Sequence, residues 1–205
     1  MVWLPVSELQ VRLPAVHFLS HTCSIDRDSI ATSEQTAQNK GNCLVAWKLH
    51  VSEKKSVLFV CLGNICRSPT GEGVLKHLVD QQGRDEEVFI DSAGTIGYHE
   101  GNPADSRMRK HAAKRGYELL SRSRKISDDD TDRFDLVIAM DRQNQEDILA
   151  IDPQATNVRL LSAFLDDSWP VDVPDPYYGG SEGFETVLDM IEAACPGILS
   201  ELIDS

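Results

Sequence analysis

The chain has 205 residues, of which 41% are hydrophobic and 26% charged, a composition that supports one globular core. No apolar run approaches the roughly 18 residues that a membrane-spanning helix needs, which excludes a transmembrane protein. Acidic residues outnumber basic ones by 33 to 20, and residues 56–205 account for the imbalance with 28 acidic and 14 basic residues. A surface this negative disfavours nucleic acid and anionic membranes as partners.

Residues 1–55 differ in character from the rest and are predicted to form a poorly structured N-terminal extension. They show no helical apolar period, and polar residues crowd the stretch 29–42. The first 25 residues contain a single acid, Glu8, as transit peptides to a plastid or mitochondrion do. Because Arg12 is the only basic residue in that stretch, a tail on a cytoplasmic protein is the favoured interpretation, and organelle targeting is the alternative.

From residue 56 to the end, the predicted domain alternates short apolar runs with amphipathic stretches. The apolar runs predict buried strands at 57–62, 88–90, 136–140 and 158–161. The other stretches predict helices that begin at Pro69, at Asn102–Pro103 and at Asp141, and a last helix whose apolar face carries Phe184 and Cys195. This alternation predicts an α/β, three-layer domain with a four-stranded parallel sheet flanked by helices. Ligands of such sheets bind beyond the carboxyl ends of the strands.

A loop suited to binding phosphate follows the first strand, in the run Cys61-Leu62-Gly63-Asn64-Ile65-Cys66-Arg67-Ser68-Pro69. Its backbone amides and the N-terminus of the next helix would surround one anion. Gly63 and Asn64 allow the tight backbone turn, and Arg67 can bind two phosphate oxygens. The same positive field would lower the pKa of Cys61, and Ser68 can hydrogen-bond the resulting thiolate. The loop therefore predicts a cysteine nucleophile below a bound phosphate.

The run Cys61 to Pro69 resembles the active-site signature of the low-molecular-weight protein tyrosine phosphatases. Four further motifs of that family follow in order, namely Asp91–Thr95, Gly101–Pro103 with Asp105 and Arg107, Met140-Asp141, and Asp175-Pro176-Tyr177-Tyr178-Gly179. The resemblance covers about residues 56–203. It implies a cofactor-free enzyme that hydrolyses phosphotyrosine in proteins, and small aryl phosphates, through a cysteinyl-phosphate intermediate.

Asp175 is the predicted general acid of this reaction. Its carboxyl group could protonate the leaving phenolate and then take a proton from the attacking water. Pro174 and Pro176 restrict the backbone on both sides of it. An ordinary turn aspartate before a proline is the alternative interpretation, which the nearby cysteine loop disfavours.

The resemblance also implies roles for residues around the loop. Tyr98, Tyr177 and Tyr178 would line a slot for a flat aromatic substrate. An apolar Ile65 suits a phosphotyrosine ring, whereas relatives that act on arginine phosphate tend to have threonine there. Support of the loop would come from Asn64, Ser68, Ser92 and Asp141. Many relatives steady the loop with a histidine at the position that Ser121 occupies here. His111 is expected on a helix surface, and the run Asp128–Asp130 in a solvated loop.

Cys66 lies five residues after Cys61, so a reversible disulfide between them is geometrically plausible, and a small apolar filler is the alternative. The five cysteines are too few for a disulfide scaffold and show no zinc-site spacing. Rival functions on the same scaffold are a non-tyrosine phosphatase and an arsenate reductase. An arsenate reductase needs two relay cysteines downstream, but only Cys195 follows Cys66. A non-catalytic phosphate-binding module would be expected to lose Cys61, Arg67 or Asp175, and all three are present. A sulfurtransferase also uses a cysteine in an anion loop but does not need Asp175.

Overall fold

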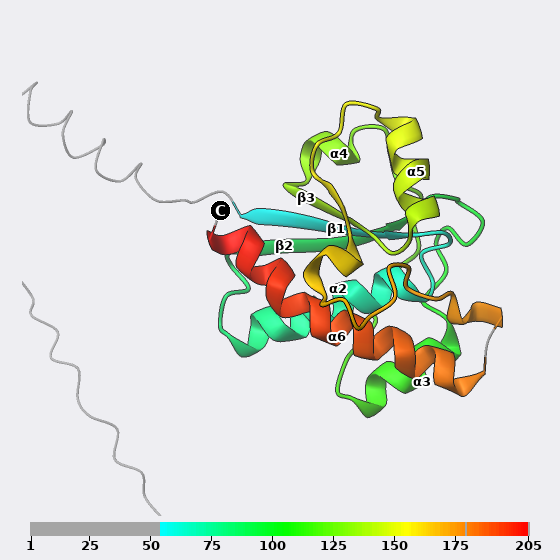
Figure 1. Ribbon diagram of the computed structural model, residues 1–205. Helices are drawn as coiled ribbons and strands as arrows, with labels where there is room; N and C mark the ends of the chain where they lie inside the picture. The colour runs from blue at the N-terminus through cyan, green and yellow to red at the C-terminus, as the bar shows by residue number, and fades with distance from the viewer. Residues whose placement is uncertain (1–53, 179, 205) are drawn as a thin grey trace, which may run out of the picture. The chain divides into compact units, whose positions relative to one another are not determined.

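The computed structural model of the chain describes residues 54–178 and 180–204 (Figure 1). Most of the predicted N-terminal extension, with its transit-peptide interpretation, lies outside the described residues. Within them, a four-stranded sheet contains β1 (Lys55–Cys61), β2 (Val88–Gly94), β3 (Leu136–Ala139) and β4 (Val158–Leu160). The order is β2-β1-β3-β4, and all neighbouring strands are parallel. The predicted parallel sheet is confirmed, with β1 at its centre.

Helices cover both faces of this sheet, which gives the three predicted layers (Figure 1). One face carries α2 (Arg67–Gln81), α3 (Ser106–Lys114) and α6 (Ser181–Asp204), and the other carries α4 (Asp130–Arg133) and α5 (Arg142–Ile151). Successive residues of β1 point to opposite faces, so Val57 and Phe59 pack in the core with α2 and α6, while Leu58 and Val60 pack in the core with α5. Each such side chain contributes roughly 1.5–3 kcal/mol when fully buried. This burial holds the carboxyl end of β1 in place.

Two helices begin at other residues than the sequence predicted. α2 begins at Arg67, two residues before Pro69. α3 begins at Ser106 and not at Asn102–Pro103, because the Asp105 carboxylate accepts hydrogen bonds from the backbone N–H groups of Arg107 and Met108. Pro103 lies before the helix, in an isolated antiparallel bridge with Arg122.

Two side chains expected at the surface are partly or fully buried. The His111 ring stacks on Phe184 of α6 with 5.3 Å between the ring centroids, and its Nδ1 contacts the Glu185 carboxylate. Asp130 is 1% exposed and accepts a hydrogen bond of 2.7 Å from Arg124. Asp128 and Asp129 are exposed as predicted, and only Asp130 departs from the prediction for that run. His111 and Asp130 are covered because side chains elsewhere in the chain, Phe184 with Glu185 and Arg124, pack against them. Among residues 54–178 and 180–204, no helix combines the length and the apolar character that crossing a membrane requires.

Candidate active site

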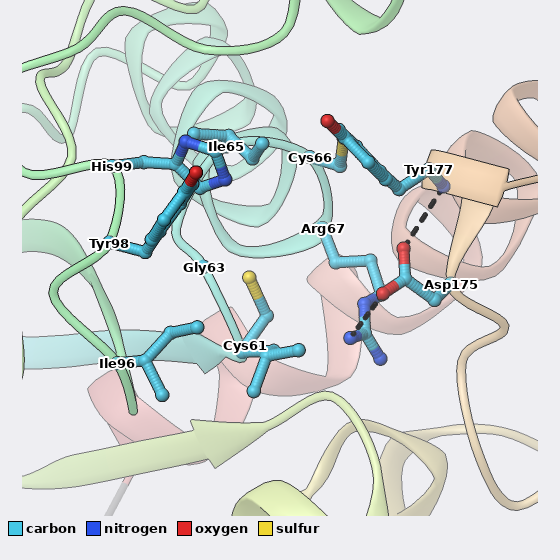
Figure 2. Close-up of a pocket in the computed structure, with 11 residues that line it drawn as sticks. Cys61, Gly63, Ile65, Cys66, Arg67, Ile96, Tyr98, His99, Asp175 and Tyr177 are labelled. Carbon is cyan, nitrogen blue, oxygen red and sulfur yellow. Dashed lines mark hydrogen bonds and ion pairs between the residues drawn. The ribbon is translucent and has the colours of Figure 1, made fainter.

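A pocket of about 350 Å³ opens where β1 ends and the loop 62–66 leads into α2 (Figure 2). Cys61, the last residue of β1, lies in it with 3% of its surface exposed. Its Sγ is 3.1 Å from the Ser68 hydroxyl, at the first turn of α2. The pocket is lined by Cys61, Leu62, Gly63, Ile65, Cys66, Arg67, Ile96, Tyr98, His99, Asp175 and Tyr177. The lining includes the three predicted catalytic residues and most of those expected to contact phosphate or substrate, whereas Asn64 and Ser68 do not line the pocket.

Asn64 shapes the loop from behind the pocket. Its φ of 52° is left-handed, the one such value among the described non-glycine residues. Its side-chain amide donates hydrogen bonds of 2.9 Å to the hydroxyls of Ser68 and Ser92, and its Oδ1 accepts one of 2.9 Å from the Arg124 N–H. Gly63 is needed for space and not for its backbone angles, since a Cβ there would lie 3.1 Å from the His99 ring. These contacts hold the loop backbone around the point above Cys61.

Glu72, which the sequence analysis missed, extends this network away from the pocket. Its buried carboxylate accepts a hydrogen bond of 2.6 Å from the Ser92 hydroxyl and pairs with Lys76 one turn along α2. Ser121 lines a small cavity of about 70 Å³ that Glu72 also lines. Within the described residues, the Ser121 hydroxyl makes no hydrogen bond to the loop. Glu72, and not Ser121, therefore supports the loop from outside, through its hydrogen bond with Ser92.

Arg67 is buried beside the loop and is held by two other segments. Its Nη1 donates to the Asp141 carboxylate and, over 3.1 Å, to the Val173 carbonyl, while its Nη2 lies 3.4 Å from Asp175 Oδ2. Burial opposes the charge of Arg67, but Cys61 and the two carboxylates raise the pKa of the guanidinium above its usual value. The other oxygen of Asp141 accepts from the Asn144 N–H and caps α5. Asp141 therefore orients a permanently charged arginine.

Asp175 lies on the segment between the 3₁₀-helices Leu161–Phe164 and Pro176–Tyr178. One of its oxygens faces Arg67, and the other accepts a hydrogen bond of 3.0 Å from the Tyr177 N–H (Figure 2). The carboxylate is thus fixed on both sides at the edge of the pocket. It lies across the pocket from the loop that carries Tyr98 (Figure 2).

Aromatic side chains form the rim. Tyr98 is 84% exposed, and its ring packs edge-on against His99 at 4.9 Å between centroids. His99 in turn lies 6.5 Å from the Tyr177 ring. His99 and Ile96 also line the pocket and were not predicted to do so, although their position in the loop after the second strand was a usable signal. Nothing is described for the side chain of Tyr178, so its predicted role in the slot lies outside the described residues.

Cys66 also lines the pocket, and it and Cys61 are free thiols. Burial, followed by the negative charge of Asp105, raises the pKa of the Cys66 thiol far above its usual value. This shift favours the protonated form of the Cys66 thiol, which is a poor nucleophile.

Known proteins match the chain over the same region. A family model described as "Low molecular weight phosphotyrosine protein phosphatase" matches residues 56–205. The chain belongs to this family. It is 43% identical over 149 residues to a low molecular weight protein-tyrosine-phosphatase of Streptomyces coelicolor, which covers 70% of this chain and 91% of that protein.

Solved structures confirm the fold of this phosphatase family. A protein tyrosine phosphatase of Entamoeba histolytica, crystallised with Hepes in its active site, matches with a TM-score of 0.71 and 41% identity over 74% of this chain and 98% of that one. A Drosophila arginine phosphatase matches with a TM-score of 0.65 and 30% identity over 71% and 96%. The chain is accordingly an enzyme of the low molecular weight protein tyrosine phosphatase class.

Proposed function

We propose that this phosphatase hydrolyses phosphotyrosine in proteins, and small aryl phosphates, through a phosphoryl group carried on Cys61. The observation that carries the proposal is the pocket in which Cys61 Sγ, Arg67 and Asp175 meet although they come from β1, α2 and a distant segment. A nucleophile, a charge stabiliser and an acid are the three groups that such a transfer needs.

In the first step, the Cys61 thiolate attacks phosphorus. The S–P bond forms as the bond between phosphorus and the aryl oxygen breaks, and the Asp175 proton passes to the departing phenolate. Arg67 and the loop N–H groups stabilise the charge that spreads over the phosphoryl oxygens. In the second step, water gives a proton to Asp175 and attacks phosphorus. Inorganic phosphate leaves, and the thiolate is restored.

The rim of the pocket favours an aromatic leaving group. Ile65, Tyr98 and Tyr177 present apolar and aromatic surface around the entrance, and aromatic rings prefer edge-to-face or offset contacts with such partners. The similarity to an arginine phosphatase keeps phosphoarginine as the competing substrate. Arsenate reduction is disfavoured, because the one cysteine after Cys66 is Cys195, which is buried in α6 outside this pocket.

The test measures phosphate release from a phosphotyrosine peptide, a phosphoarginine peptide and an aryl phosphate. We expect the wild-type chain to favour the phosphotyrosine peptide and the aryl phosphate, and a metal chelator to leave the rates unchanged. Cys61→Ser should abolish turnover yet still bind vanadate. Asp175→Asn should lose about 10²–10⁴-fold on phosphotyrosine. Hydrolysis by Cys61→Ser at a near-normal rate, or faster hydrolysis of phosphoarginine, would contradict the proposal.

A further inference from the structure

An arginine that plays no part in the proposed chemistry joins the two sides of the pocket. Arg107 lies in the first turn of α3, and its guanidinium nitrogens Nη1 and Nη2 are each 3.3 Å from the Tyr177 carbonyl oxygen. The same group lies over two aromatic rings, 5.3 Å from the centroid of Tyr177 and 5.1 Å from that of Phe184. Arg107 therefore contacts both the backbone and the side chain of the residue beside the acid segment.

Tyr177 links Arg107 to Asp175 through its backbone. The N–H of Tyr177 donates a hydrogen bond of 3.0 Å to Asp175 Oδ1, while its carbonyl accepts from Arg107. The orientation of the Asp175 carboxylate thus depends on where the Tyr177 backbone lies. The proline on each side of Asp175 restricts φ but leaves the position of the segment over the pocket undetermined.

The other side of Arg107 is tied to the phosphate loop. Its Nε and Nη2 donate to the two oxygens of Asp105 over 3.1 Å and 2.9 Å. The Asp105 N–H in turn donates a hydrogen bond of 2.8 Å to the carbonyl of Ile65, inside the loop. A continuous chain of contacts therefore runs from the loop that carries the nucleophile, through Asp105, Arg107 and Tyr177, to the acid.

We infer that Arg107 is a positioning residue that sets Asp175 at proton-transfer distance from the leaving group. The inference rests on the proposed function, in which Asp175 is the general acid. The Arg107 side chain is 46% exposed, and exposed ion pairs contribute little to folding stability. Catalytic geometry is far more sensitive, since a displacement of about 1 Å can cost about 10²-fold in rate. Loss of Arg107 should accordingly slow proton transfer to the leaving group much more than it lowers the free energy of unfolding.

The experiment uses the full chain and measures the phosphorylation rate of the enzyme on aryl phosphates whose phenols differ in pKa. Arg107→Met keeps an apolar stem over the two rings and removes every donor. We expect a loss of about 10-fold or more on the poorest leaving group and a much smaller loss on nitrophenyl phosphate, because an activated phenolate needs less protonation. Arg84→Met is the matched control, since Arg84 is also a half-buried arginine paired with a carboxylate, Glu87, in the turn before β2.

Two further variants separate the possible outcomes. Arg107→Gln tests the same point if Arg107→Met does not fold, and the melting temperature of each variant shows whether it does. In an Asp175→Asn background, Arg107→Met should add no further dependence on the leaving group. A wild-type dependence in the folded Arg107 variants, or an equal loss across the whole series, would overturn the inference. If Asp175→Asn itself keeps the wild-type dependence, the acid assignment fails instead.

Discussion

The phosphate loop and the acid segment face each other across one pocket, yet the protein holds them by different means. The loop is supported by buried hydrogen bonds among small polar side chains, those of Asn64, Ser68 and Ser92. The segment around Asp175 is more exposed, and arginines from other elements hold it. Arg142 binds Asp172 over 2.6 Å, Arg67 contacts Val173 and Asp175, and Arg107 contacts the Tyr177 carbonyl.

This difference has a physical consequence for each side. Buried polar networks are costly to break, because a lost partner leaves a desolvated group unsatisfied. Exposed ion pairs contribute about 0–1 kcal/mol and weaken as salt is added. The loop after β1 therefore rests mainly on buried contacts, whereas the segment around Asp175 combines the buried Arg67 with the more exposed Arg107 and Arg142.

Arg67 belongs to both sides, so its replacement should have the largest effect. Arg67→Lys keeps the charge but not the planar pair of donors that can bind phosphate and orient toward Asp141 together. We expect kcat/KM on an aryl phosphate to fall by about 10²–10³-fold or more. Arg84→Lys, at a remote arginine, should leave it unchanged. A mild loss in Arg67→Lys would show that the backbone N–H groups of the loop suffice.

Peroxide should inactivate the enzyme through the phosphate loop alone. Hydrogen peroxide would oxidise the Cys61 thiolate to a sulfenic acid, and the Cys66 thiol, after losing its proton, would then attack that sulfur to form a disulfide and release water. We expect most of the activity to be lost and then recovered with a thiol reductant. Peptide mass mapping should find the linked pair.

The control for the peroxide experiment is Cys66→Ser. This variant should be inactivated without recovery, because the sulfenic acid of Cys61 then oxidises further. Equal recovery in this variant, or a wild-type chain that carries only Cys61 sulfinic acid, would remove Cys66 from a protective role.

Asn64 tests how far the buried network holds the phosphate loop. Asn64→Gly accepts the left-handed backbone but loses the side-chain hydrogen bonds, and Asn64→Ala loses both. We expect the glycine variant to lower the free energy of unfolding by about 1–3 kcal/mol, and the alanine variant by roughly 1–2 kcal/mol more. Denaturant unfolding measures both, and kcat/KM should fall with them. A glycine variant as stable as the wild type would show that backbone conformation alone shapes the loop.

Removal of the N-terminal extension should have the smallest effect, since every group on both sides of the pocket lies at residue 61 or later. We propose that residues 56–205 form the phosphatase domain and that residues 1–55 are an appended segment. A chain that starts at Ser52 should keep its kcat/KM on an aryl phosphate. A loss of solubility or activity would show that the segment packs on the domain.

The segment 1–55 can also be tested for its effect on the cellular compartment of the protein. A fluorescent protein fused after residue 55 should remain in the cytoplasm if the segment is a tail. Its import into a plastid or mitochondrion would support the transit-peptide alternative.

The sequence by itself determined the parts of this protein that depend on neighbouring residues. The apolar run before Cys61 specified a strand buried on both faces. The order of glycine, asparagine, arginine and serine after it predicted a tight turn suited to an anion, because backbone angles and helix starts are local properties. The alternation of strands and helices was enough to predict the parallel sheet and the edge at which the pocket lies.

Only the tertiary structure decided which distant side chains meet at that edge. Arg67 contacts Asp141 and Asp175 across 74 and 108 residues, and Glu72 reaches Ser92 across 20. The sequence places His99 in the loop after β2 and Arg107 in a family motif, but it does not show which side chains either residue contacts. Hydrogen bonds and ion pairs act over a few ångströms, so their partners are set by the packing of helices on the sheet. That packing, and not the spacing of residues along the chain, assembled the acid side of the pocket.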